Sequence, residues 1–262
     1  MLDNAPKATT VRLSALTLNT WNCQGDYRPR LTAMTRGLAA ATPDIILLQE
    51  VFSNRDGSDN TARALAKDLN LACAYHPART KTRRLADEPI LCSSGLAVLS
   101  RHPIVWSERF ALPADPRDGE RIAQFTEIDI NRTRLLIVNL HLSHLEYADN
   151  LRRQQLDCIV RRMANTWTHD HILLGGDFNA DADATLFELF ADYPALSAMR
   201  ALSSAPIGLG VDHLFAVRRR DAAPLLLSSA SAMLDKADEQ TGVFASDHVG
   251  VQAWITLGAA PA

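Results

Sequence analysis

The stretch LLGGDFN, residues 173–179, joins an apolar run to two polar side chains through a pair of glycines. The apolar part predicts a buried strand, and the glycines allow a tight turn and a close approach of the backbone to a ligand. Asp177 and Asn179 are two positions apart, so they are expected to point the same way. A carboxylate beside an amide can hold a metal, an attacking water or a phosphoryl oxygen, although an Asx-type turn would also explain Asn179.

Other apolar runs carry polar side chains at their ends, where an enzyme can build a site on a rigid frame. Glu50 follows residues 45–49, and burying its carboxylate is costly unless a cation such as Mg²⁺ or an arginine meets it. Asn19 ends a second run and offers a neutral oxygen to the same ion or to its water. His141 follows a third run and offers an imidazole that can donate to a phosphoryl oxygen.

The triplet Ser246-Asp247-His248 comes directly before the last apolar run, residues 249–255. Adjacent residues of an extended chain face opposite ways, so Asp247 and His248 cannot be partners of each other. We therefore expect Asp212 to orient the ring of His248, which leaves Asp247 free to reach a metal. His248 would act as general base or general acid, because the ordinary pKa of histidine lies near neutrality.

The composition bounds the class of protein. The chain has 262 residues, 47% of them hydrophobic, and a formal net charge of −3. This charge does not favour binding to nucleic acid and does not exclude it. The four cysteines form no CxxC pair, which argues against disulfides and a zinc knuckle and suits a reducing cytosol. The N-terminal segment lacks the features of a secretory signal, and no apolar stretch approaches the roughly 20 residues that span a bilayer. A cytoplasmic protein without a membrane anchor is therefore expected.

Strand-like and helix-like patterns alternate irregularly along the chain. Strands are predicted at residues 11–19, 45–49, 95–100, 122–130, 134–140, 171–175, 213–217 and 249–255. Helices are predicted at residues 31–38, 62–69, 149–167 and 185–191, and polar loops that rim a cleft at 78–89 and 113–120. A hairpin around residues 131–133 favours an α+β sandwich, two packed sheets with helices outside, over a doubly wound fold. We expect one domain over residues 1–262, with residues 1–10 as a flexible tail.

Motifs of serine hydrolases, zincins, NTPases and dinucleotide-binding proteins are absent from the sequence. The chain instead resembles the endonuclease/exonuclease/phosphatase superfamily, the DNase I-like enzymes, with neutral sphingomyelinases and tyrosyl-DNA phosphodiesterase 2 as its nearest branches. The matching motifs occur in family order, from about residue 12 to about residue 255. They are LTLNTWN (16–22), DIILLQEV (44–51), SGLAVLSRHPI (94–104), VNLHLSH (138–144), LLGGDFNA (173–180), VDHLF (211–215) and SDHVGV (246–251).

The resemblance implies a four-layered α/β sandwich and Mg²⁺- or Mn²⁺-dependent cleavage of a phosphoester by in-line attack of water on phosphorus. The metal ligands that it implies are Glu50, Asn19 and Asp247. The catalytic residues that it implies are His248, Asp212, His141, Asp177 and Asn179. His141 would contact the phosphate, Asp177 and Asn179 would position the water or the phosphate, and Asp212 and His248 would form the Asp–His pair of the active site.

The substrate is expected to be a nucleic acid or phospholipid-type diester. A basic loop at residues 78–85 carries Arg83 and Arg84, which with Arg121 are predicted to bind the substrate unless the loop is merely solvated. No long apolar hairpin is present to enter a lipid surface, and aromatic residues for base stacking are sparse. The alternative is a phosphomonoesterase of small molecules, with Arg117 and Arg121 near the leaving alcohol. A non-catalytic binding protein is a remote alternative, since no residue of the polar set is missing; no protein partner is evident.

Overall fold

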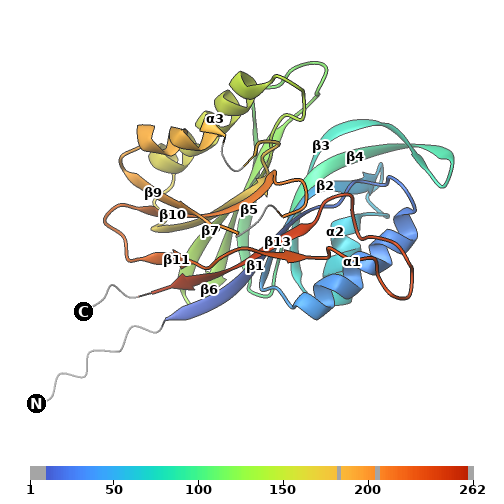
Figure 1. Ribbon diagram of the computed structural model, residues 1–262, viewed down its shortest axis with the longest axis horizontal. Helices are drawn as coiled ribbons and strands as arrows, with labels where there is room; N and C mark the ends of the chain where they lie inside the picture. The colour runs from blue at the N-terminus through green and yellow to red at the C-terminus, as the bar shows by residue number, and fades with distance from the viewer. Residues whose placement is uncertain (1–9, 182–183, 204–206, 259–262) are drawn as a thin grey trace, which may run out of the picture.

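Two β-sheets pack face to face in the computed structural model, which describes residues 10–181, 184–203 and 207–258 (Figure 1). The first sheet has the strand order β11-β13-β1-β2-β4-β3, with β12 paired to β13. Its strands are β1 (Val11–Asn19), β2 (Ile45–Asn54), β3 (Ala72–Leu85), β4 (Glu88–Ser100), β11 (Leu225–Leu227), β12 (Ser231–Met233) and β13 (Gly250–Leu257). β1 and β2 run parallel, and the remaining neighbours are antiparallel.

The second sheet has the order β5-β6-β7-β8-β10-β9. Its strands are β5 (Ile104–Ala111), β6 (Ile122–Ile130), β7 (Thr133–His141), β8 (His171–Asp177), β9 (Leu196–Arg200) and β10 (Asp212–Arg219). β7 and β8 run parallel and the other pairs are antiparallel, so both sheets are mixed. The predicted hairpin around residues 131–133 joins β6 to β7.

Helices cover both outer faces of the paired sheets. α1 (Tyr27–Ala41) and α2 (Thr61–Leu69) pack on the first sheet, and α3 (Asp149–Thr166) and the 3₁₀ helix η1 (Thr185–Asp192) pack on the second (Figure 1). The predicted α+β fold, a four-layered α/β sandwich of two mixed sheets flanked by helices, is therefore confirmed. Among the described residues, no helix has the length and apolar character needed to cross a membrane.

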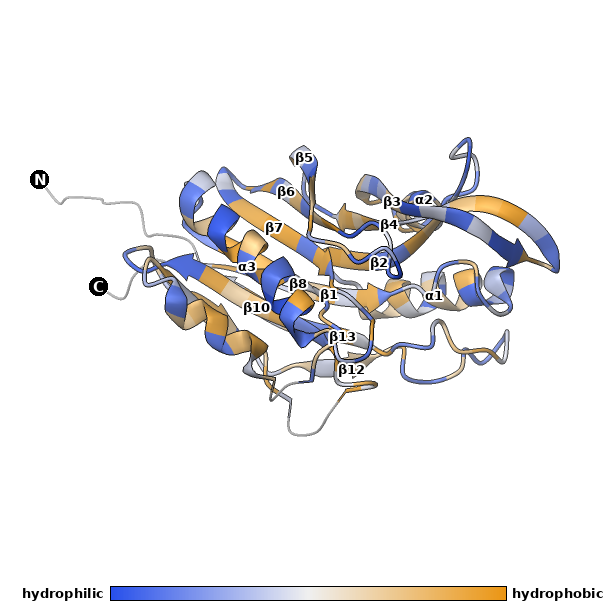
Figure 2. Ribbon diagram, turned by 90° about the horizontal axis from the view of Figure 1, so that it is seen from above, coloured by the Kyte–Doolittle hydropathy of each residue, from blue (hydrophilic) through white to orange (hydrophobic). Residues whose placement is uncertain are grey.

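Alternation along the buried strands divides the core between the layers. In β2, Ile45 and Leu47 pack with Leu173 of the second sheet, whereas Ile46 and Leu48 pack beneath α1 and α2. β7 is apolar over most of its length (Figure 2), as expected of a strand that is covered on both faces. Because the central strands are buried on both sides, their ends are held in fixed positions.

The predicted strands are all present, and most of them extend further than predicted. The sequence pattern misses β3, β5, β9, β11 and β12, because these are short or partly exposed strands at the edges of the sheets and lack a clear apolar alternation. The flexible tail predicted for residues 1–10 lies outside the described residues except for Thr10.

The loop predicted at residues 78–89 is instead a hairpin formed by β3 and β4 that projects beyond the sandwich (Figure 1). Its two strands pair from Thr80 opposite Ser93 to Leu85 opposite Glu88. The two turn residues, at positions 86 and 87, have φ of 47° and 67°, and positive φ at both is typical of a tight two-residue hairpin turn. Polar residues on both faces of the hairpin explain why its sequence resembles a loop. The loop predicted at residues 113–120 is present.

Candidate active site

Strand directions bring four of the predicted residues to one end of the central strands of the first sheet. β1 and β2 are parallel, with Asn19 opposite Gln49, so Glu50 lies beside the end of β1. β13 runs antiparallel to β1, and Asp247 and His248 directly precede it, so both lie at this same end. Side chains from the two ends of the chain therefore meet here.

The second sheet contributes three more residues in adjacent positions of its ladder. His141 at the end of β7 lies opposite Asp177 at the end of β8, and Asp177 lies opposite Asp212 at the start of β10. A hydrogen bond of 2.9 Å from Asn19 Nδ2 to Asp177 Oδ2 connects this set to the first sheet. The two sheets thus place their polar strand ends at one common end of the sandwich.

Asp177 is the centre of this cluster. Besides the amide of Asn19, its Oδ2 lies 3.5 Å from His141 Nε2 and 3.9 Å from His248 Nε2. Its Oδ1 accepts a hydrogen bond of 2.9 Å from the main-chain N–H of Asn179. The carboxylate is 1% exposed, so these polar neighbours replace the water that it loses on burial.

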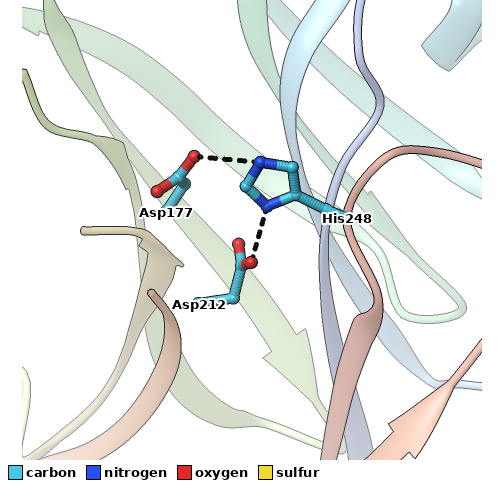
Figure 3. A group of neighbouring side chains, drawn as sticks. All are labelled: Asp177, Asp212 and His248. Carbon is cyan, nitrogen blue, oxygen red and sulfur yellow. Dashed lines mark hydrogen bonds and ion pairs between the residues drawn. The ribbon is translucent and has the colours of Figure 1, made fainter. Parts of the chain in front are cut away.

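Asp212 orients the ring of His248, as predicted (Figure 3). His248 Nδ1 lies 2.7 Å from Asp212 Oδ2, and its Nε2 is thereby turned toward Asp177. The second carboxylate oxygen of Asp212 is buried and has no hydrogen-bond partner within the described residues. Ligand atoms of Asp177, Asp212 and His248 lie within 4.8 Å of one another, close enough to hold a metal ion.

Burial and charge set different protonation states within the cluster. Burial raises the pKa of Asp177 to about 6, with a further contribution from the negative charge of Asp212. Burial also lowers the pKa of His141 well below its ordinary value of 6.5. Burial acts in the same direction on His248, but the hydrogen bond and charge of Asp212 outweigh it and raise the pKa to about 9. At neutral pH, His141 is therefore neutral and His248 is positively charged.

Glu50 lies at a bulge in β2, where the pairing with β4 shifts between Leu48 and Val51. Its φ is 50°, a left-handed conformation that is uncommon outside glycine and that re-aims the side chain. Burial raises the pKa of its carboxyl, as do the negative charges of Asp177 and Asp247. In the part of the chain that the structure describes, no group donates a hydrogen bond to this carboxylate. A carboxylate that lies near two others and has no hydrogen-bond donor among the described residues fits a hard divalent cation.

The glycines before Asp177 serve close packing rather than the predicted turn. Both belong to β8, and Gly176 has a φ of 139°. A Cβ atom on Gly176 would lie 2.0 Å from the main-chain oxygen of Leu140 in the neighbouring strand. The chain turns after Asp177, where the hydrogen bond from the N–H of Asn179 to Asp177 Oδ1 forms an Asx-type turn. The Asn179 amide donates to the oxygen of Leu142.

A pocket opens beside the cluster, bounded by the projecting hairpin. Glu50, His141 and Asp247 line its inner part. Its outer walls include basic side chains, from Arg79, Lys81 and Arg83 of β3 and from Arg121 and His144. Two of the three arginines predicted to bind substrate, Arg83 and Arg121, thus lie in this pocket.

Arg84 does not line the pocket, although the sequence groups it with Arg83. Successive side chains of a strand point to opposite faces, so Arg84 faces away from the side that Arg83 occupies. It pairs with Asp87 at the exposed hairpin tip instead. Arg117 also lies outside the pocket lining and pairs with Asp115.

Arg30 of α1 is a polar residue of this region that the sequence reasoning missed. Its side chain is 3% exposed and donates to five main-chain oxygens. They belong to Thr20, Trp21, Asn22, Gln24 and Ala245. These oxygens belong to the loops that follow Asn19 and precede Asp247. One signal was available: Arg30 has the same helical spacing as the buried Met34 and Leu38.

A family model described as "Endonuclease/Exonuclease/phosphatase family" matches residues 20–248 of the chain. This range contains seven of the eight predicted catalytic and metal-binding residues, with Asn19 directly before it. No curated protein matches the sequence.

Solved structures with a similar fold cover nearly the whole chain. An endonuclease/exonuclease/phosphatase from Beutenbergia cavernae is 20% identical, with a TM-score of 0.71 over 95% of this chain and 72% of the other. The human Nocturnin catalytic domain with bound sulfate anion is 16% identical, with a TM-score of 0.69 over 96% and 98%. D. rerio TDP2 complexed with single strand DNA product is 15% identical, with a TM-score of 0.66 over 93% and 98%. At these identities the likeness concerns the fold.

Proposed function

Because the chain belongs to the endonuclease/exonuclease/phosphatase family, whose members act on phosphoester bonds, we propose that it is a metal-dependent phosphodiesterase. It hydrolyses a P–O bond by in-line attack of water. The observation that carries this proposal is the convergence on Asp177 of Asn19, His141 and His248, with Asp212 behind His248. An amide, two imidazoles and two carboxylates at one point supply the groups that phosphoester hydrolysis needs.

The metal-binding residues in this proposal are Glu50, Asp247 and Asn19, which hold Mg²⁺ or Mn²⁺. The unpaired carboxylate of Glu50 supports this assignment, as does the mutual repulsion of Glu50, Asp177 and Asp247. Asn19 Oδ1 already accepts a hydrogen bond from the main-chain N–H of Trp21, and its remaining lone pair is left for an ion. A bound divalent ion supplies positive charge that stabilises the phosphoryl oxygens in the transition state.

The protonation states divide the proton-transfer work between two groups. Asp177, with a pKa of about 6, is ionised at neutral pH and basic enough to take a proton from the attacking water. Asn179 helps to position that water or the phosphate. His248 is protonated through its contact with Asp212, so it donates to a phosphoryl or leaving oxygen. His141 stays neutral and donates a hydrogen bond to another phosphoryl oxygen.

A nucleic acid-type diester is the substrate that we propose to test first, before a phospholipid-type diester. The basic walls of the pocket support an anionic substrate. The similarly folded D. rerio TDP2, whose structure contains a single strand DNA product, makes nucleic acid a sensible first choice. The free thiols of all four cysteines suit the cytoplasm as the proposed compartment.

The experiment is hydrolysis of bis-p-nitrophenyl phosphate beside p-nitrophenyl phosphate, with Mg²⁺, Mn²⁺ or EDTA. We expect metal-dependent cleavage of the diester that is lost in His248→Ala. The control is His102→Ala. His102 follows β4 near the start of β2, at the end of these strands that lies away from the site. Preference for the monoester would favour the phosphomonoesterase instead. Cleavage that survives EDTA or the His248 substitution would contradict the proposal.

A further inference from the structure

Strand β3 presents a regular row of cations to the pocket. Arg79, Lys81 and Arg83 alternate with Thr80, Thr82 and Arg84, and only the first three line the pocket. Alternation in a strand places Arg79, Lys81 and Arg83 on one face. Ser94, Gly95 and Leu96 of the neighbouring strand β4 line the same pocket. A Cβ atom on Gly95 would lie 2.3 Å from the main-chain oxygen of His76, so glycine at this position allows β3 and β4 to approach closely.

Within the described residues, none of these three cations forms an ion pair with a carboxylate side chain. Arg79 Nη1 donates to the main-chain oxygen of Asp118 at 2.6 Å, which fixes the hairpin to the loop at residues 113–120. Among the residues that the structure describes, Arg83 donates to the main-chain oxygen and the Sγ of Cys92, at 3.4 and 3.5 Å. Lys81 is exposed and makes no ion pair within the described residues. Burial lowers the pKa of Lys81, and the charges of Arg83 and Arg79 lower it further, whereas the charge of Glu50 acts in the opposite direction.

The charged side chains that residues 120, 121 and 144 contribute to the pocket already have partners of opposite charge or hydrogen-bond partners. Arg121 is paired with the fully buried Asp118, which also lies 2.7 Å from His144 Nδ1. The carboxylate of Glu120, which lines the pocket as well, lies 3.4 Å from Arg109. The free positive charge of the pocket is therefore concentrated on the β3 side. The charges of Arg83 and Glu50 act on each other, as do those of Lys81 and Glu50, so this side lies next to the inner part, where the cleaved phosphate would lie.

We propose that Lys81 and Arg83 form a subsite for a second phosphate of the substrate, distinct from the phosphate that is cleaved. This inference rests on the proposed function and adds to it a substrate class: esters that carry at least two phosphates. A nucleotide strand and a bisphosphorylated small molecule share this chemistry. A phosphate held here would bridge the ammonium and the guanidinium, each of which forms charge-assisted hydrogen bonds to phosphate oxygens.

The test compares two chromogenic esters that differ by one phosphate. They are thymidine 5′-(p-nitrophenyl phosphate) and the same compound with a 3′-phosphate. For the wild type we expect kcat/KM to be higher for the bisphosphate by on the order of tenfold, or about 1.4 kcal/mol. Lys81→Met and Arg83→Met should each remove most of this preference, measured as the ratio of kcat/KM for the bisphosphate to kcat/KM for the monophosphate ester. Arg84→Met, on the opposite face of the same strand, loses the same charge and should keep the preference.

The outcomes separate the subsite from the proposed function. If neither ester is hydrolysed with Mg²⁺ or Mn²⁺, the phosphodiesterase proposal fails. If both are hydrolysed equally well by the wild type, or if Arg84→Met behaves like Arg83→Met, the subsite is refuted and the phosphodiesterase stands. Lys81 is exposed, so Lys81→Met gives the answer even where Arg83→Met disturbs folding. A trinucleotide ester distinguishes the two kinds of substrate. If kcat/KM for it exceeds that for the bisphosphate, the substrate is a nucleotide strand; if the two values are equal, it is a bisphosphorylated small molecule.

Discussion

Arg30 Nη1 donates a hydrogen bond of 3.0 Å to the main-chain oxygen of Ala245, which lies 215 residues further along the chain. The same side chain holds the loop after β1, and Ser246 Oγ donates to the oxygen of Asn19 at 2.6 Å. The two loops that carry Asn19 and His248 are therefore fixed to each other through a buried guanidinium. No carboxylate is needed, because five main-chain oxygens satisfy its five N–H groups.

Replacement of Arg30 should weaken both the fold and the site. Arg30→Lys keeps the charge but cannot reach five oxygens, so we expect a loss of about 2 kcal/mol in the free energy of unfolding. Because the loops would shift, kcat should fall more than KM rises. Urea unfolding and steady-state kinetics measure the two effects. Arg36→Lys, in the same helix with its side chain 39% exposed, is the control. Equal behaviour of the two variants would count against a positioning role.

Replacement of Glu50 should separate stability from activity. Its pKa is raised in the folded protein, so the ionised carboxylate destabilises the folded state at neutral pH when no cation is bound. We therefore expect Glu50→Gln to raise the melting temperature in EDTA and to lower kcat by about 10²-fold or more. Mg²⁺ should raise the melting temperature of the wild type and leave that of the variant unchanged. Glu146→Gln, at an exposed position, is the control. A stabilising effect of Mg²⁺ that persists in Glu50→Gln would remove Glu50 from the metal site.

His213 should make stability depend on pH. Burial lowers its pKa from 6.5 to about 4, so the unfolded chain takes up a proton that the folded protein does not. The folded state is therefore fully favoured above pH 6.5 and loses stability as the pH falls toward 4. Between pH 7 and pH 5 this group alone should account for about 2 kcal/mol. His213→Gln keeps a donor for the oxygen of Ala180 and should lose less stability over that range in urea unfolding. An unchanged pH dependence would show that His213 titrates normally.

The strands that carry the site could be predicted because each joins a fully apolar run to a polar end. β1 and β6 have the predicted bounds, and the pairing of Asp212 with His248 follows from adjacent residues pointing apart. Such patterns are local, so they are legible in a sequence without any knowledge of the tertiary contacts.

What could not be predicted depends on contacts between distant segments. The bulge at Glu50 arises from the register of β2 against β4, which no single segment specifies. The β3–β4 hairpin has polar residues on both faces, so its ladder of main-chain hydrogen bonds leaves no apolar pattern. Arg30 resembles a solvated helix residue until the loops that it binds are in place.

Because β1 pairs with β13, the first sheet cannot be completed until both strands have been synthesised. Among the described strands, β1 comes first and β13 last along the sequence, yet Val11 lies opposite Leu257 and Thr17 opposite Val251. While the chain is growing on a ribosome, β1 has one edge without its final neighbour until β13 has emerged. A chain that ends before residue 248 would therefore lack His248 and would leave one edge of β1 unpaired.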